Sequence, residues 1–281
     1  MINLDGLEGF DNLEDLNREL QKRVNAHNKS SIEDFENLAP GQMRALQNFP
    51  TEEGPLLMNK LSETHLENCP LLVQVRLLID KMKGGKEIKL TKTGALPVKL
   101  VKEIYALGCL KNEWVEKGIS KLYRESDAEE VSITRIILEI SVLAKKRNGK
   151  LSLTKTGEKY ADDANFILQE ILNVLWYKFN WAYYDRYESE AIGRVNPAFS
   201  LLLLKKYGDK ERDSHFYAKK YFRAFPQLLE QRESSFSCYA LRTFDRYFRF
   251  MGFVNVEKTG ILEPSILKKT EFFDQLFSLE K

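Results

Sequence analysis

The chain has 281 residues, with 43 Lys and Arg against 41 Asp and Glu, 43% hydrophobic side chains, 15 Gly, 8 Pro and 3 Cys. Ordinary Gly and Pro contents exclude a collagen-like or low-complexity chain, and three thiols are too few for a disulfide framework. A chain of this length buries about two-thirds or more of its unfolded surface, so we expect a globular protein of one or two domains.

Charge and aromatic side chains are unevenly distributed along the chain. Residues 1–70 hold 13 acidic and 6 basic side chains, whereas residues 71–281 hold 28 and 37. Residues 160–281 contain 26 of the 32 Tyr, Phe and Trp. These shifts predict an acidic helical N-terminal part (1–70), a first folded unit (71–157) and an aromatic-rich second unit (158–281).

Helical periodicity dominates the first 85 residues. Residues 11–25 have apolar side chains at steps of three and four, which predicts an amphipathic helix with the stripe Leu13, Leu16, Leu20 and Val24. Pro40 is placed to open a second helix. A third helix is predicted from Pro70 to the Gly84-Gly85 stop.

A pentapeptide, LTKTG, occurs twice, at residues 90–94 and 153–157. Each copy follows a predicted Leu, Ile and Val-rich helix closed by Gly, and each precedes another helix. A Thr hydroxyl can cap the unpaired amides that open a helix, which gives the junction a physical reason. A weaker third version ends the chain, with a helix at 238–250 and a hairpin at 253–270.

These junctions resemble those of winged-helix proteins. In that family a three-helix core ends in a β-hairpin wing whose last strand often reads Leu-Thr-x-x-Gly. The segment 90–103 also looks like one found in uncharacterised bacterial proteins, a resemblance that implies no activity. The winged-helix resemblance implies a mainly helical (α+β) protein with two winged-helix-like units and short β-hairpin wings. The first runs from Pro97 through a helix at 132–147 to a strand at 151–154, and the second from 196 to 270.

The sharpest candidate site is the helix at 238–250. Leu241, Phe244, Phe248 and Met251 form its apolar face, and three arginines follow the other side at Arg242, Arg246 and Arg249. By resemblance to a recognition helix, these arginines are expected to contact phosphates or base edges of DNA, with Lys258 on the wing. The alternative is a solvated face whose Arg stems cover apolar surface.

Two further stretches carry concentrated positive charge. Residues 81–102 hold seven Lys against one Glu, and Lys89 and Lys92 are predicted to follow a phosphate backbone. The same lysines could instead be solvated or bind the acidic N-terminal part. Lys145, Lys146, Arg147 and Lys150 are assigned to the end of the helix at 132–147, where cations complement the helix dipole and require no ligand.

A long helix is predicted over 158–187, and its last part is crowded with aromatic side chains. Residues 176–187 contain seven aromatics in twelve positions, which could stack on unpaired bases. Their helical spacing favours a buried or subunit-contact role.

Enzymatic signatures are absent from the sequence. It contains no GxxxxGK[ST], GxGxxG, HExxH or GxSxG motif, and its three histidines lie in separate segments. Cys69, Cys109 and Cys238 lack ligand spacing and are interpreted as buried hydrophobes. We therefore expect no catalytic residues, no metal and no cofactor.

The expected partner is double-stranded DNA, bound by a non-enzymatic and regulatory protein. The alternative is a protein-interaction module that binds another protein through the acidic N-terminal part or the 176–187 segment. No apolar window approaches the ~20 residues that span a bilayer, and the N-terminus has no basic and apolar leader, so we expect a cytoplasmic protein with no membrane contact.

Overall fold

The computed structural model of the protein describes residues 12–50, 53–258, 260 and 263–280. These residues are mainly helical, with small antiparallel sheets, as the sequence predicted. The N-terminal part contains α1 (Leu13–Lys29), the 3₁₀ turn η1 (Glu33–Phe35), α2 (Pro40–Gln47), β1 (Leu56–Met58) and α3 (Glu63–Leu66). The helices predicted from the Leu stripe and from Pro40 are therefore confirmed.

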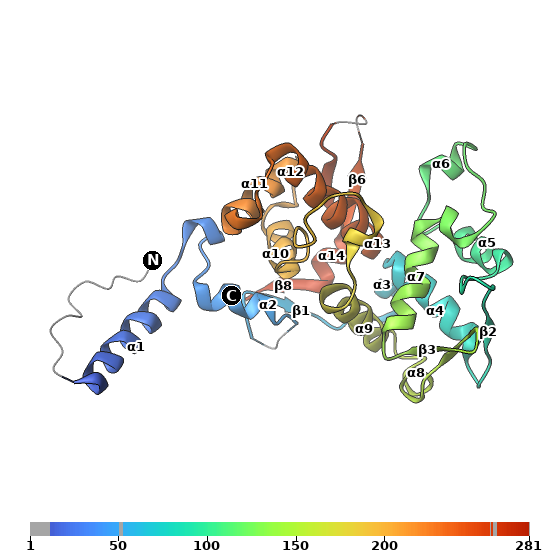
Figure 1. Cartoon of the computed structure of the whole chain (residues 1–281), viewed down its shortest axis with the longest axis horizontal. Coiled ribbons are helices and arrows are strands. Elements are labelled where there is room, and N and C mark those ends of the chain that lie inside the picture. Colours follow the sequence, from blue (N-terminus) through green and yellow to red (C-terminus); the bar gives the residue numbers. More distant parts are fainter. Residues whose placement is uncertain (1–11, 51–52, 259, 261–262, 281) are drawn as a thin grey trace.

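The first unit combines three main helices with a three-stranded sheet, at the right of Figure 1. Its elements are α4 (Pro70–Met82), β2 (Ile88–Lys89), α5 (Val98–Ala106), the short α6 (Glu113–Glu116), η2 (Glu125–Asp127), α7 (Glu129–Ile140), β3 (Ala144–Arg147) and β4 (Lys150–Leu153). The sheet order is β2-β4-β3, and both pairings are antiparallel. The unit thus includes α4 and β2, which lie before the Pro97 start implied by the winged-helix resemblance but within the range 71–157 given by the shifts in composition, apart from Pro70.

The helix predicted at 132–147 is wrong in its second half. Helix α7 ends at Ile140, and the chain continues into strand β3. Asn148 and Gly149 have φ angles of +50° and +70°. Positive φ at two successive residues is the geometry of a tight hairpin turn, and Asn-Gly is its preferred sequence. The basic residues 145–150 therefore lie on a hairpin and do not cap a helix.

The second unit repeats the order of elements found in the first. Its elements are α10 (Pro197–Tyr207), β5 (Arg212–Asp213), α11 (Ser214–Ala224), η4 (Pro226–Leu228), α12 (Arg232–Ala240), the π-helical η5 (Leu241–Phe248), α13 (Arg249–Met251), β6 (Val254–Glu257) and β7 (Ile266–Lys269). The last three helical elements follow one another directly along the chain. The sheet order, β5-β7-β6, again places the last strand in the middle. The hairpin predicted at 253–270 is confirmed.

A capped helix follows the last strand of each unit. Thr154 accepts a hydrogen bond from the Gly157 amide at 2.9 Å and opens α8 (Lys155–Lys159). Thr270 accepts one from the Phe273 amide at 3.2 Å and opens α14 (Glu271–Leu276). Gly157 is required by space, because a Cβ there would lie 1.9 Å from the Leu143 carbonyl oxygen. Threonine capping was the role predicted for this junction.

The first LTKTG copy is not equivalent to the second. Residues 90–94 form a turn after β2, the first strand of its sheet, where Gly94 has a φ of +80°. The expectation that both copies end a wing is therefore wrong for residues 90–94. The structural repeat is carried by the order of helices and strands and not by this pentapeptide.

Helix α9 (Ala164–Tyr177) packs against α4 and α7 of the first unit. The long helix predicted over 158–187 is thus broken, and its aromatic end forms the 3₁₀ turn η3 (Trp181–Tyr184). Trp176 and Trp181 are buried, whereas Tyr183 is exposed, so the buried role predicted for this segment applies to part of it. One continuous apolar core includes side chains from both units.

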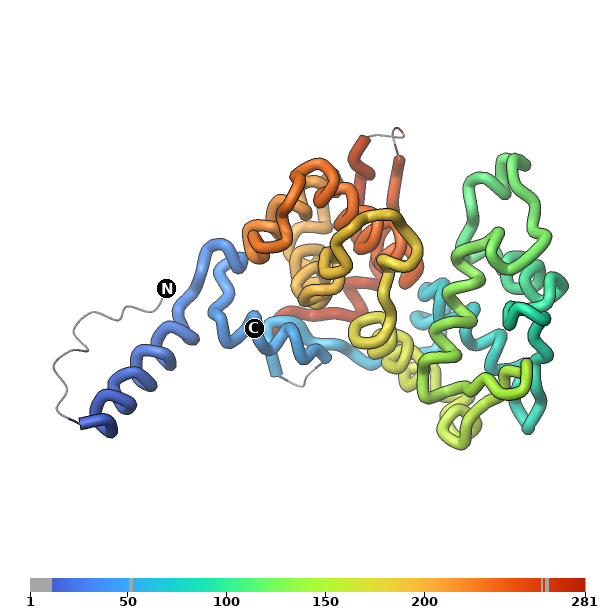
Figure 2. Tube along the Cα trace, viewed as in Figure 1, coloured from blue at the N-terminus to red at the C-terminus, as the bar shows by residue number. Residues whose placement is uncertain are grey.

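The N-terminal part is attached to the second unit. Arg223 of α11 forms ion pairs with Glu33 and Asp34, and Lys220 pairs with Glu36 at 2.8 Å. Strand β1 pairs with β8 (Phe277–Leu279) near the C-terminus. Glu33, Asp34 and Glu36 therefore bind α11, and no acidic side chain of residues 12–50 and 54–70 pairs with the lysines of residues 81–102. Beyond this attachment α1 extends away from the body (Figure 2).

No helix in the described part of the chain is long and apolar enough to span a bilayer.

Candidate nucleic-acid interface

Arg242 lies inside the protein and not on a DNA-facing surface. Its side chain is 1% exposed. Its Nε and Nη2 atoms donate to the two carboxylate oxygens of Asp185, both at 2.8 Å. Its Nη1 donates to the Ser189 and Ile192 carbonyls at 2.6 and 3.0 Å. Four of its five N–H donors are thus used and the side chain is buried, so this guanidinium is not placed to contact a phosphate.

The other predicted cations of the second unit also have acidic partners. Arg246 is 7% exposed, with its Nε 2.7 Å from a Glu129 oxygen and its Nη1 3.3 Å from Asp185. Arg249 pairs with Glu130 at 3.2 Å. The predicted wing cation, Lys258, is exposed but lies 3.1 Å from Asp245.

The arginine cluster connects parts of the fold. Glu129 and Glu130 open α7 of the first unit, and Asp185 follows η3. These ion pairs therefore join the second unit to the first unit and to the segment after η3. Although burial acts in the opposite direction, the hydrogen bonds from Arg242 hold the pKa of Asp185 below its ordinary value. The sequence expectation that Arg242, Arg246 and Arg249 stand free in solvent is wrong, because their acidic partners come from distant segments.

Positive charge is exposed instead on the outer face of the first unit's sheet. Lys89 of β2 lies opposite Lys150 of β4, and Lys150 lies opposite Arg147 of β3. Directly opposed residues point to the same side of a sheet, so the three form a row across all three strands. Lys145 and Ser152 form the next outward pair. We call Lys89, Lys145, Arg147 and Lys150 the basic sheet face.

The basic sheet face is incompletely neutralised. Glu87 pairs with Lys150. The described residues provide no side-chain partner for Lys89, Lys145 or Arg147, nor for Lys92 in the neighbouring turn, and all four are exposed. Residues 83–94 and 141–159 together carry ten Lys and Arg against two Glu, in a chain whose total charge is only +2.

The helices that precede the two hairpins have little free surface. In α7 the sole exposed residue is Ile140, and Arg135 is paired with Glu125 and Glu139. The π-helical η5 is held by the arginine cluster described above. Neither helix therefore presents free cationic side chains to a groove.

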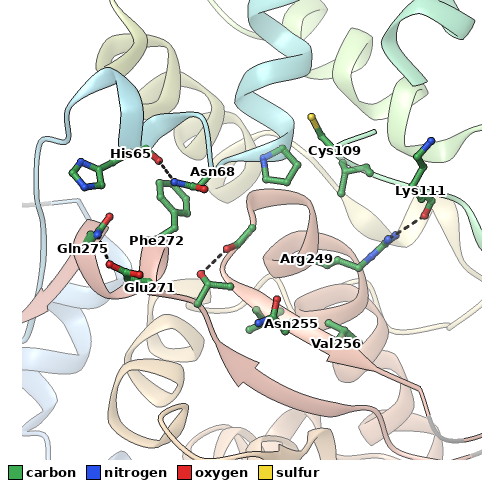
Figure 3. Close-up of a pocket in the computed structure, with 15 residues that line it drawn as sticks. His65, Asn68, Cys109, Lys111, Arg249, Asn255, Val256, Glu271, Phe272 and Gln275 are labelled. Atoms are coloured by element: carbon green, nitrogen blue, oxygen red, sulfur yellow. Dashed lines mark hydrogen bonds between the residues drawn. The ribbon is translucent and has the colours of Figure 1, made fainter. Parts of the chain in front are cut away.

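One pocket lies between the loops of the first unit and the hairpin region of the second (Figure 3). Its volume is about 710 Å³, and its charged or nucleophilic lining includes His65, Cys109, Lys111, Arg249 and Glu271. His65 and Cys109 stand on different sides of it in Figure 3. Burial raises the pKa of the Cys109 thiol, which keeps the sulfur in its unreactive neutral form.

Among the described residues, no group of three or more His, Cys, Asp and Glu is placed to hold a metal ion. Cys69 and Cys238 are buried thiols, as the sequence predicted, and Cys109 is half-buried.

Residues 67–165 match the family model described as the Y4jL N-terminal domain. The match spans the first unit from the end of α3 to the start of α9, including the basic sheet face. Neither the comparison with curated proteins nor that with solved structures found a match.

Sequence reasoning identified Lys89 but missed the surface to which it belongs. The sequence pattern assigns Lys145, Arg147 and Lys150 to a helix end. Two local signals in the sequence indicate the hairpin: the Asn148-Gly149 turn, and the alternation of polar and apolar residues in Lys150-Leu151-Ser152-Leu153. The register that aligns three cations has no local signal, because it pairs β2 with a strand more than 60 residues later.

Proposed function

We propose that the protein binds the phosphate backbone of nucleic acid, with double-stranded DNA as the first candidate, through the basic sheet face of its first unit. Both units are interpreted as winged-helix units, with the β3–β4 hairpin as the contacting wing. The repeated order of helix, strand, helix, helix and hairpin, with the last strand in the middle of each sheet, supports this interpretation.

The row Lys89, Lys150 and Arg147 is the observation that carries the proposal. Like charges placed directly opposite one another destabilise a sheet. Neighbouring strands lie ~4.8 Å apart, so the row concentrates three charges within about 10 Å. A bound polyanion would neutralise this repulsion, and release of its counterions would favour binding.

Binding of this kind is expected to be independent of sequence. Backbone contacts position a protein on a duplex, while base edges are read by groups that enter a groove. The arginines expected to read bases form ion pairs with Asp185, Glu129 and Glu130. The proposed setting remains the cytoplasm.

The test is a titration of labelled duplex DNA, single-stranded DNA and RNA by fluorescence anisotropy over a range of salt concentrations. Five backbone contacts, from the basic sheet face and Lys92, would give a slope of log K against log salt of about −4.5 on duplex. The triple variant Lys89→Ala, Arg147→Ala, Lys150→Ala is expected to reduce the slope to about −1.8. Scrambled duplexes should bind equally well.

The matched control removes three exposed cations from the second unit, Lys210→Ala, Lys219→Ala and Lys268→Ala, which have no side-chain partner among the described residues. It changes the net charge by the same amount and should keep the wild-type slope. Equal losses in the two triple variants would indicate a nonspecific charge effect and contradict the proposal, as would the absence of salt-sensitive binding.

The second candidate function is protein interaction, and a different surface favours it. The connection that contains α6 exposes three large apolar side chains, Trp114, Ile119 and Tyr123. Exposed aromatic and aliphatic groups this close in sequence are typical of contact surfaces. If Trp114→Ala and Tyr123→Ala leave nucleic-acid binding unchanged while abolishing capture of a protein partner, both functions reside on the first unit.

A further inference from the structure

Strand β6 is a free edge of the second unit's sheet, whose strand order is β5-β7-β6. The Thr270 amide donates to the Phe253 carbonyl at 3.0 Å, and the same register continues from Val254 to the end of the strand. Hydrogen-bonded and non-hydrogen-bonded pairs alternate along an antiparallel ladder. Asn255 therefore bonds to β7, while the N–H and C=O groups of Val254 and Val256 point away from it.

These four backbone groups have no hydrogen-bond partner in the part of the chain that the structure describes. Val254 is nevertheless only 5% exposed. A backbone group that is shielded from water without a partner costs free energy comparable to a lost hydrogen bond. A further strand beside β6 would supply the missing donors and acceptors.

The free edge of β6 forms one wall of the pocket in Figure 3. Val254, Asn255 and Val256 line this pocket in succession. Successive side chains of a strand point to opposite faces, so a pocket that borders all three lies along the edge and not over one face. Pro70 and the loop 109–111 of the first unit line it from the other side. With this loop opposite, the edge is open to a single extended segment and not to the sheet of a second copy.

The two units differ in how their edge strands are protected. The corresponding edge strand of the first unit, β3, carries Lys145, Lys146 and Arg147, and charged side chains, lysine above all, oppose the addition of a strand. Strand β6 reads Val-Asn-Val-Glu, with two β-branched residues, no lysine and no proline. Strand β6 thus has the composition of an edge that can accept another strand.

The charges that line the pocket indicate what the added segment carries. Lys111 and Arg249 each have an acidic partner within the first unit, at 3.6 and 3.2 Å. Glu271 lies at the other end of the pocket in Figure 3 and has no cationic partner among the described residues. A basic side chain of the added segment would complement this carboxylate.

We propose that β6 is a docking edge for an extended segment of another protein. The segment adds as a fourth strand to the β5-β7-β6 sheet and places a basic side chain against Glu271. This binding mode goes beyond the second candidate function, since it uses neither Ile119 nor Tyr123, and it is independent of the basic sheet face.

The test titrates short fluorescent peptides of alternating Val and Thr with one Lys into the full chain, followed by anisotropy. A matched probe with the same side chains but methylated backbone nitrogens should bind at least ~10-fold more weakly, because its backbone cannot donate. A probe with Glu in place of Lys should bind about 3-fold more weakly, and Glu271→Gln should remove this difference.

The decisive variant of the protein is Val256→Pro, which removes an N–H group from the free edge and none from the β6–β7 ladder. It should weaken binding of the Lys probe about 5-fold or more. The matched control, Val256→Ala, shortens the same side chain but keeps the N–H group, and its affinity should stay within about 2-fold of the wild type. Circular dichroism checks that each variant is folded.

Hydrogen exchange gives a readout that needs no variant. The bound Lys probe should slow exchange of the Val254 and Val256 amides and leave residues 144–147 of β3 unchanged. Equal affinity of the methylated probe, unprotected β6 amides, or no binding of any probe would each overturn the proposal. The triple variant of the basic sheet face should bind the Lys probe as the wild type does, so a failure of nucleic-acid binding and a failure of this proposal are distinguishable.

Discussion

Arg242 and Lys89 illustrate how partners decide the role of a cation. Both were expected to contact nucleic acid. Arg242 is enclosed by Asp185 and by two backbone carbonyls, whereas Lys89 stands exposed beside two other cations. Removing one member of a buried, hydrogen-bonded pair leaves the other charge uncompensated, while removing an exposed cation has little effect on folding.

Arg242→Ala is therefore expected to destabilise the protein and to leave nucleic-acid binding unchanged. The loss should be about 3–5 kcal/mol in the free energy of unfolding, because Asp185 would remain buried with only the longer contact from Arg246 at 3.3 Å. Lys258→Ala removes an exposed pair with Asp245 and should cost about 0–1 kcal/mol. Urea denaturation followed by circular dichroism measures both. Similar losses in the two variants would contradict the role assigned to Arg242.

At the turn from β4 into α8, the close approach of two backbone segments leaves no room for a side chain at one position. Gly157 lies against the Leu143 carbonyl, and Thr154 caps the helix on the same turn. The sequence pattern Leu-Thr-x-x-Gly thus has two physical reasons here, a cap and a close approach of two backbone segments. In the copy at 90–94, the glycine instead provides a positive φ.

Gly157→Ala should cost about 3 kcal/mol or more in unfolding free energy, because the added methyl cannot be accommodated without moving the backbone. Gly149→Ala is the control: its φ is +70° and no atom lies near its Cβ position, so the cost should be about 1 kcal/mol from backbone strain alone. Thermal unfolding of both variants compares them. A smaller loss for Gly157→Ala would show that the junction can open.

Elements with strong local signals were predictable from the sequence. The stripe of α1, the proline that opens α2 and the hairpin of the second unit all follow from residues within one segment. The end of α7 was missed because Leu143 and Ala144 continue its apolar pattern, although they belong to the following loop and strand. The burial of Arg242 was harder to predict, because its partner Asp185 lies 57 residues earlier in the chain.

At the scale of the whole molecule, the two units turn their third helices inward. Arg246 of η5 and Arg249 of α13 pair with Glu129 and Glu130 at the start of α7. The faces of these helices that could otherwise enter a DNA groove are therefore covered by contacts within the protein. The first unit's sheet remains outward, and α1 leaves the body on the other side of Figure 1.

Lysine acetylation with and without duplex DNA, read by mass spectrometry at low salt, tests the central claim most directly. Lys89, Lys92, Lys145 and Lys150 should be protected from modification by bound DNA, because their ammonium groups would lie against phosphates. Lys210, Lys219 and Lys268 should react at unchanged rates. Protection of the second-unit lysines, with the basic sheet face reacting as freely as in the unbound protein, would contradict the account.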